Sequence, residues 1–121
     1  MEPCKIEWLI IPAPDLDAAK KFYERVFGFS VSKYSERFWV FKSGTLSGGL
    51  DADLIPNEKG IRFSITVSAI DKALEAIIRE GGTIITPGCS LGAKAGFYAK
   101  FKDPNGNVLE LYSEMLNNNT K

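Results

Sequence analysis

The sequence predicts an α+β fold made of two tandem β-α-β-β-β modules, whose eight strands form one curved mixed sheet with the helices outside it. Three observations support this prediction: two segments repeat each other, each repeat contains one amphipathic helix, and β-rich runs flank both helices. One helix covers only one face of four strands. Two modules side by side therefore leave a concave inner face, lined from both halves, where a small ligand would bind.

The repeat relates residues 14–31 to residues 68–85 at a spacing of 54. Apolar residues recur at helical spacing in both segments, which predicts two helices that each bury one face. Short polar residues favour helix starts and glycine favours helix ends. The predicted caps are Asp15 and Ser68 at the N-termini and Gly28 and Gly81 at the C-termini.

Runs of β-branched and aromatic residues precede and follow each predicted helix. The predicted strands cover residues 5–11, 29–34, 37–43 and 48–54 in the first half, and 61–67, 82–86, 95–102 and 107–112 in the second. The motif "DPNG" is a tight turn, and "IPNEKG" is a short linker between the halves. We expect a single domain over 1–121, with module 1 at about 5–55, module 2 at about 60–113, and a polar tail over 114–121.

The composition excludes several classes of function. Fifteen basic residues balance fifteen acidic ones, so no net charge attracts nucleic acid or an anionic membrane. No apolar run reaches the roughly 20 residues that span a bilayer, and "MEPCKIEW" lacks signal-peptide features, so we expect a cytoplasmic protein. Cys4 and Cys89 lie far apart and are predicted free thiols.

The chain contains no histidine. This removes the commonest general base and the commonest metal ligand together. Catalytic triads built on histidine and three-histidine metal sites are therefore excluded.

Two motifs resemble one known family. The helix segment "DLDAAKKFYERVFGF" and the final "FKDPNGNVLELY" are similar to the signatures of the vicinal oxygen chelate superfamily, also called the glyoxalase/bleomycin-resistance/dioxygenase family. The resemblance covers residues 5–113 and implies a pair of modules, usually in a homodimer whose cavities involve both modules. It implies no single reaction, because members include metal-dependent lyases, isomerases, epimerases, ring-cleaving dioxygenases and thiol transferases, as well as non-catalytic drug binders.

The resemblance also implies four inward-facing positions that hold a metal in the family. Counted from the motifs, three of them fall on Trp8, Arg62 and Glu110. The spacing differs in the first half, so the motif count leaves the fourth open, and pairing "GLDA" with "VLEL" suggests Asp51. Only the two acids bind metals, the indole does not, and a guanidinium repels a cation. We therefore expect no cofactor and no divalent metal at these positions. A metal bound elsewhere, or brought with substrate oxygens, stays open.

Arg62 and Glu110 stand at two positions that project into one cavity, so we expect an ion pair between them. The pair is either a structural relic or a site that binds a polar ligand group by exchanging partners. Strand parity and the match between the halves place further polar and aromatic side chains around it, unless some aromatics pack in the core or in a dimer interface. The predicted ligand-binding residues are Trp8, Trp39, Asp51, Arg62, Ser64, Tyr98, Glu110 and Tyr112.

Three hypotheses follow. The first is a homodimeric protein that binds a small organic molecule without the usual metal, in which Glu110 is the candidate general base if there is any catalysis. The second is a metal-dependent lyase, isomerase or dioxygenase with an atypical site at Asp51 and Glu110. The third is a structural or regulatory dimer without catalysis. None of them involves nucleic acid or a membrane as a partner.

Overall fold

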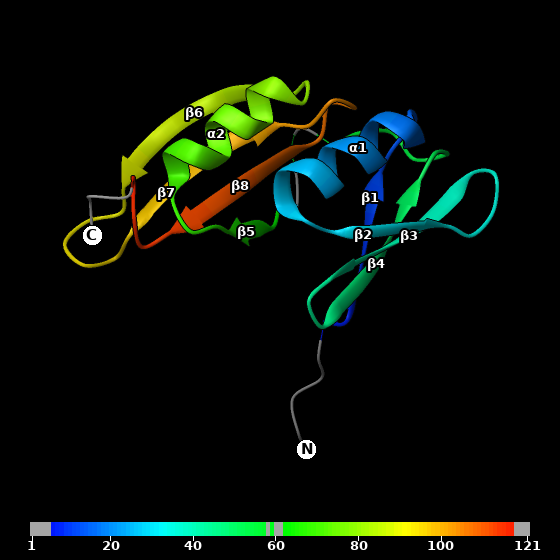
Figure 1. Ribbon diagram of the computed structural model, residues 1–121, viewed down its shortest axis with the longest axis horizontal. Coiled ribbons are helices and arrows are strands. Elements are labelled where there is room, and N and C mark those ends of the chain that lie inside the picture. Colours follow the sequence, from blue (N-terminus) through cyan, green and yellow to red (C-terminus); the bar gives the residue numbers. More distant parts are fainter. Residues whose placement is uncertain (1–5, 58, 60–61, 118–121) are drawn as a thin grey trace, which may run out of the picture.

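A computed structural model describes residues 6–57, 59 and 62–117, and it contains the two predicted β-α-β-β-β modules (Figure 1). The first module consists of β1 (Trp8–Pro12), α1 (Leu16–Phe27), β2 (Ser30–Lys33), β3 (Phe38–Ser43) and β4 (Leu46–Asp51). The second consists of β5 (Ser64–Thr66), α2 (Ile70–Arg79), β6 (Thr83–Ser90), β7 (Phe97–Lys102) and β8 (Val108–Ser113). Cys89 is a free thiol, whereas Cys4 and the beginning of the strand predicted over 5–11 lie outside the described residues.

The α+β fold with two modules is confirmed, and the eight strands divide between two four-stranded mixed sheets. The strand orders are β1-β4-β3-β2 and β5-β8-β7-β6. In each sheet the strand before the helix pairs in parallel with the last strand, while the other pairs are antiparallel. Of the four edge strands, β1 and β5 lie at the junction between the modules, since Leu9 of β1 and Ser64 of β5 border one common space there.

The two helices begin in different ways. Asp15 caps α1 as predicted, since its carboxylate accepts a hydrogen bond from the Ala18 N–H (3.0 Å), and Gly28 ends the helix at φ +71°. The prediction that Ser68 caps α2 is wrong: the N-cap is Ala69, with no side-chain cap. Backbone carbonyls of the C-terminal segment accept the first N–H groups of α2 instead. Among the described residues, no helix is long and apolar enough to cross a membrane.

The core lies between the helices and the sheets, and both helices lie on the same side of the molecule (Figure 1). The fully buried Phe22 and Tyr23 of α1 contact each other edge to face, with ring centroids 5.1 Å apart. Phe22 also packs against Phe101 of β7, at 6.1 Å, so this core joins the two modules.

The strand β6 continues to Ser90, beyond its predicted end at residue 86. Its pairing with β7 shifts register between Thr86 and Cys89, on either side of Pro87. Proline donates no backbone hydrogen bond, and an irregularity in the ladder accommodates it. The strand therefore runs four residues further than the sequence predicts.

Candidate functional site

The candidate site is centred on Glu110, on the face of the second sheet that points away from the helices. Glu110 pairs with Ser64 of β5 on one side and with Lys100 of β7 on the other, so the three side chains share that face. The Nε atom of Arg62 donates to Oε2 of Glu110 at 3.0 Å, and this is the expected ion pair. Both side chains stay about one-third exposed, at 34% and 30%, so the pair is open to a ligand.

Two hollows meet at this ion pair. The first, called here the polar hollow, has a volume of about 320 Å³ and is lined by Ser64, Leu91, Tyr98, Lys100, Glu110, Leu111 and Tyr112. The second, the junction hollow, measures about 450 Å³ and lies between β1, the linker after β4 and Arg62. Its lining is mainly apolar and includes Ile10 and Pro12. One partner of the ion pair thus lines each hollow.

The surroundings of the ion pair carry an excess of positive charge. The cations Lys100 and Arg62 both lie beside the single carboxylate of Glu110. Two cations and one anion leave one positive charge for a ligand. Sequence reasoning missed Lys100, although its parity with Tyr98 in "FYAKFK" places both on one face.

The two predicted tyrosines line the polar hollow together. Tyr98 of β7 is the direct cross-strand partner of Tyr112 of β8. The Tyr112 hydroxyl donates to the backbone oxygen of Ala95 at 3.2 Å, which helps to orient its ring. These tyrosines present both apolar ring surface and hydroxyl groups to a ligand.

The structure does not bring Trp39 to this face, and that expectation is wrong. Trp39 pairs with Leu50, and Leu50 pairs with Ile11 of β1, both of which are core residues on the helix side of the first sheet. Direct cross-strand partners point to the same face, so Trp39 packs against the core. Phe38, and not Trp39, is the residue of β3 that corresponds to Tyr98 of β7. The sequence comparison was off by one residue because the turn after β3 is shorter than the turn after β7.

Asp51 is also not the counterpart of Glu110. Ser64 pairs with Glu110 in the second sheet, and Ile10, which precedes Ser64 by 54 residues, pairs with Gly49 in the first. Gly49 therefore occupies the position equivalent to Glu110. Asp51 lies two residues further along β4, where its Oδ1 accepts from the Asp53 N–H at 2.9 Å. The short turn between β3 and β4 concealed this offset in the sequence.

The four positions at which the resemblance implies a metal thus correspond to Trp8, Gly49, Arg62 and Glu110. The indole offers only a donor N–H, glycine has no side chain, and the guanidinium is a permanent cation. One carboxylate remains, and a divalent metal needs several anionic or nitrogen ligands. Within the described ranges no group of three or more His, Cys, Asp or Glu side chains gathers at one place. The residues present do not fit the metal of the family.

Trp8 lies on the inner face of β1 but outside the lining of both hollows. Its side chain is 48% exposed, and Ile10 on the same face is 47% exposed. On β1 the inner face of the first module is thus apolar and partly open, whereas the register places Ser47 and Lys42 beside Trp8 on the same face.

Comparisons with known proteins agree with this architecture. The family model of the Glyoxalase/Bleomycin resistance protein/Dioxygenase superfamily matches residues 5–111. A glyoxylase-like domain-containing protein from Didymella fabae is 27% identical, over 86% of this chain and 89% of its own length.

Solved structures show the same fold. A glyoxalase/bleomycin resistance protein/dioxygenase family enzyme from Burkholderia phytofirmans PsJN superposes with a TM-score of 0.77 at 20% identity, over 93% of this chain and 100% of its own. Lactoylglutathione lyase from Agrobacterium tumefaciens superposes with a TM-score of 0.68 at 20% identity, over 93% and 96%. Because the family model matches nearly the whole chain and the modular fold agrees with it, the chain belongs to the glyoxalase/bleomycin resistance protein/dioxygenase superfamily.

Proposed function

We propose that the protein binds a small organic anion at the Arg62–Glu110 pair, without the metal that the superfamily commonly uses. The observation that carries the proposal is the partly exposed ion pair, which stands at two of the positions where the resemblance implies a metal. A cation that already has one carboxylate partner can exchange it for a ligand carboxylate, because the pair is only partly desolvated.

The surroundings favour a ligand with two chemically different ends. Lys100 and Arg62 supply the charge for an anionic group on the polar side. The junction hollow, with Ile10 and Pro12, supplies apolar surface for the remainder. An aromatic or branched carboxylate of modest size matches both parts.

Thermal melts with benzoate test this proposal, with benzyl alcohol as the uncharged control. Benzoate should raise the melting temperature of the wild type, and the gain should shrink in Lys100→Gln and in Arg62→Gln. Lys21→Gln, which removes an exposed lysine of α1, should keep the full gain. An equal gain in all four proteins, or none in the wild type, would contradict a site at this pair.

The metal content of the purified protein tests the second part of the proposal. We expect no stoichiometric divalent metal and no change in melting temperature on adding a chelator. One metal ion per chain, with lower stability after chelation, would instead support the metal-dependent lyase, isomerase or dioxygenase class.

We further propose that the protein is a cytoplasmic homodimer that uses the apolar inner face of β1 as part of its contact. Ile6, Trp8 and Ile10 are 83%, 48% and 47% exposed and lie at alternating positions of one segment. A contiguous exposed apolar stripe of this kind marks an interaction surface. Trp8→Glu should lower the molar mass in light scattering from dimer to monomer, whereas Tyr34→Glu, at an 80% exposed site elsewhere, should not.

A further inference from the structure

The junction between the modules has two ends. One is formed by α1 and the turn between β7 and β8, and the internal repeat relates it to the other, formed by α2 and the turn between β3 and β4. At one end the turn over residues 103–107 fills the space beside the first turns of α1. The Tyr23 hydroxyl donates to Oδ2 of the buried Asp103 at 2.8 Å, and Nδ2 of Asn105 donates to the carbonyl of Asp15 at 3.0 Å. Asn107 Nδ2 also donates to the carbonyl of Pro12. This end is closed by the protein's own chain.

The other end is hollow. A space of about 710 Å³, called here the helix-side hollow, lies between α2, β5, the end of α1 and the short turn from β3 to β4. The repeat explains the difference: Ala76 of α2 stands where α1 has Phe22, and Ser43 and Leu46 bound a turn much shorter than residues 103–107. The Ala76 methyl group therefore takes the place of a phenylalanine side chain, and the short turn between β3 and β4 does not extend into the hollow.

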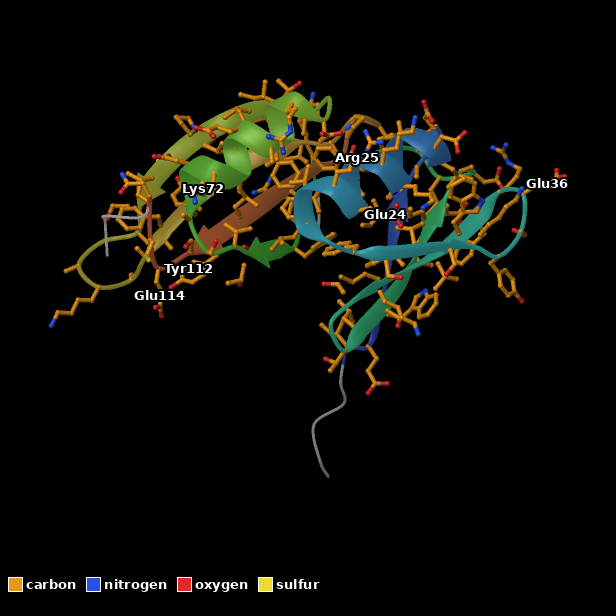
Figure 2. All side chains as sticks on the ribbon, in the orientation of Figure 1. Glu24, Arg25, Glu36, Lys72, Tyr112 and Glu114 are labelled. Atoms are coloured by element: carbon orange, nitrogen blue, oxygen red, sulfur yellow. The ribbon has the colours of Figure 1, made fainter. Side chains whose placement is uncertain are left out.

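The lining of the helix-side hollow is mainly apolar, and it also includes the hydroxyl side chains of Ser43, Ser64, Thr66 and Ser68. Phe27, Phe29 and Phe63 provide aromatic surface, and Ala73 and Ala76 form its wall on α2. The one charged side chain in the lining is Lys72, which lies in the first turn of α2 (Figure 2). Across the described part of the chain, the ion pairs present do not involve Lys72.

The start of α2 itself offers little to an anion. Its first N–H groups, those of Ile70 and Asp71, already donate to the carbonyls of Met115 and Leu116, at 3.1 Å and 2.9 Å. Any negative charge that enters this end of the hollow therefore meets the Lys72 ammonium as its main partner.

We propose that the helix-side hollow is a second binding site, which takes an amphipathic anion with a long or polycyclic apolar body. The apolar body lies among Phe27, Phe29 and Phe63, and the anionic head pairs with Lys72. Its volume lies within the range of roughly 300–1,000 Å³ usual for small-molecule sites. The hollow shares Ser64 with the polar hollow, and Leu9 and Phe63 with the junction hollow. Arg62, Lys100 and Glu110 are absent from its lining, so its charged group, Lys72, is separate from the charged groups of the site proposed above.

Fluorescence of 1-anilinonaphthalene-8-sulfonate tests the proposal, because this probe joins fused aromatic rings to one sulfonate. We expect enhanced fluorescence with one probe per chain, displaced by dodecanoate and much less by dodecanol. Benzoate should not displace it, and Lys100→Gln should leave it unchanged, so failure here and failure of the inner-face site are distinguishable.

Variants of α2 locate the probe. Ala76→Phe rebuilds the side chain that α1 carries, so it should abolish the fluorescence gain and raise the melting temperature. Ala73→Leu, one helical turn earlier, fills the same hollow with a smaller side chain and tests the same point if the first variant folds poorly. Lys72→Gln should weaken binding roughly two- to fivefold, while Lys21→Gln on α1 should not.

Two outcomes would overturn the proposal. Undiminished fluorescence in both filled variants would place the probe elsewhere, on the exposed apolar face of β1 for example. No fluorescence in the wild type, together with a drop in molar mass from dimer to monomer in Ala76→Phe, would mean that a second copy of the chain covers the hollow.

Discussion

The two modules follow one plan, yet the two ends of their junction differ in how they are filled. At the closed end, Phe22 and Tyr23 of α1 are fully buried, and Tyr23 donates to Asp103 in the turn of the other module. At the hollow end, the equivalent residues of α2 are Ala76 and Ile77. A duplicated fold thus provides two equivalent spaces, and small changes in side chain and turn length make one a structural contact and the other a cavity.

The inner faces of the modules differ in the same manner. Gly49 stands where the second module has Glu110, and Trp8 stands where it has Arg62. At these two positions the first module therefore has an apolar side chain and none, while the second has an ion pair. Four substitutions test how much the closed end of the junction and the inner-face ion pair each contribute to the free energy of unfolding.

Loss of the Phe22 side chain should have the largest effect. Phe22→Ala leaves a cavity in the core that joins the modules, and such changes cost about 3–5 kcal/mol in the free energy of unfolding. Urea unfolding measures this cost, with Ile78→Ala on the exposed side of α2 (62% exposed) as the control with little effect. A similar small cost for both variants would show that Phe22 at the closed end contributes no more to stability than an exposed side chain of α2.

Removal of the Tyr23 hydroxyl should have the next largest effect. Tyr23→Phe deletes the hydrogen bond to Asp103 in a fully buried setting, and a bond to a charged group is worth about 1.5–3 kcal/mol. Urea unfolding at about pH 8 measures this cost. Tyr34→Phe, at an exposed site, should cost almost nothing, and equal losses would argue against the contact.

The cost of Tyr23→Phe should also depend on pH. Burial raises the pKa of the Asp103 carboxyl, and hydrogen bonds from Asn107, Tyr23 and Asn105 only partly offset this. The folded pKa then exceeds the unfolded value of about 4. The stability that the protonated carboxyl contributes is present in full below about pH 4 and is lost as the pH rises through the folded pKa.

Tyr23→Phe removes a hydrogen bond that favours the ionised form, so it raises the pKa of Asp103 further. The deficit of the variant relative to the wild type should therefore grow by about 1 kcal/mol between about pH 4 and pH 8. Unfolding free energies at several pH values measure it. A deficit that stays constant across this range would mean that the hydroxyl does not contact an ionising group.

The smallest effect is expected at the inner-face ion pair. A double-mutant cycle of Arg62→Gln and Glu110→Gln should give a coupling of about 0.2–1 kcal/mol, since the pair is partly exposed. The pair of Arg37 and Asp53, exposed at 62% and 67%, is the matched reference and should couple more weakly. A coupling of several kcal/mol at Arg62 and Glu110 would identify the pair as a structural element and not as a ligand site.

The helices and most strands were predictable because their signals are local. Apolar spacing, the Asp15 cap and the glycine at position 28 act within a few residues, so α1 lies where the sequence predicts it. The ion pair was predictable because strand parity and the repeat place Arg62 and Glu110 on one face. The start of α2 was not, since carbonyls of the C-terminal segment take over the role expected of Ser68.

The sequence alone determined the α+β class, the duplication, the absence of histidine and the inner position of Glu110, because periodicity and parity depend only on neighbouring residues. Tertiary structure alone decided that Gly49, and not Asp51, is the counterpart of Glu110, that Trp39 faces the core, and that one end of the junction is hollow. Those outcomes depend on strand register and on turn length. A shift of one residue moves a side chain to the opposite face, and only the paired strands reveal it.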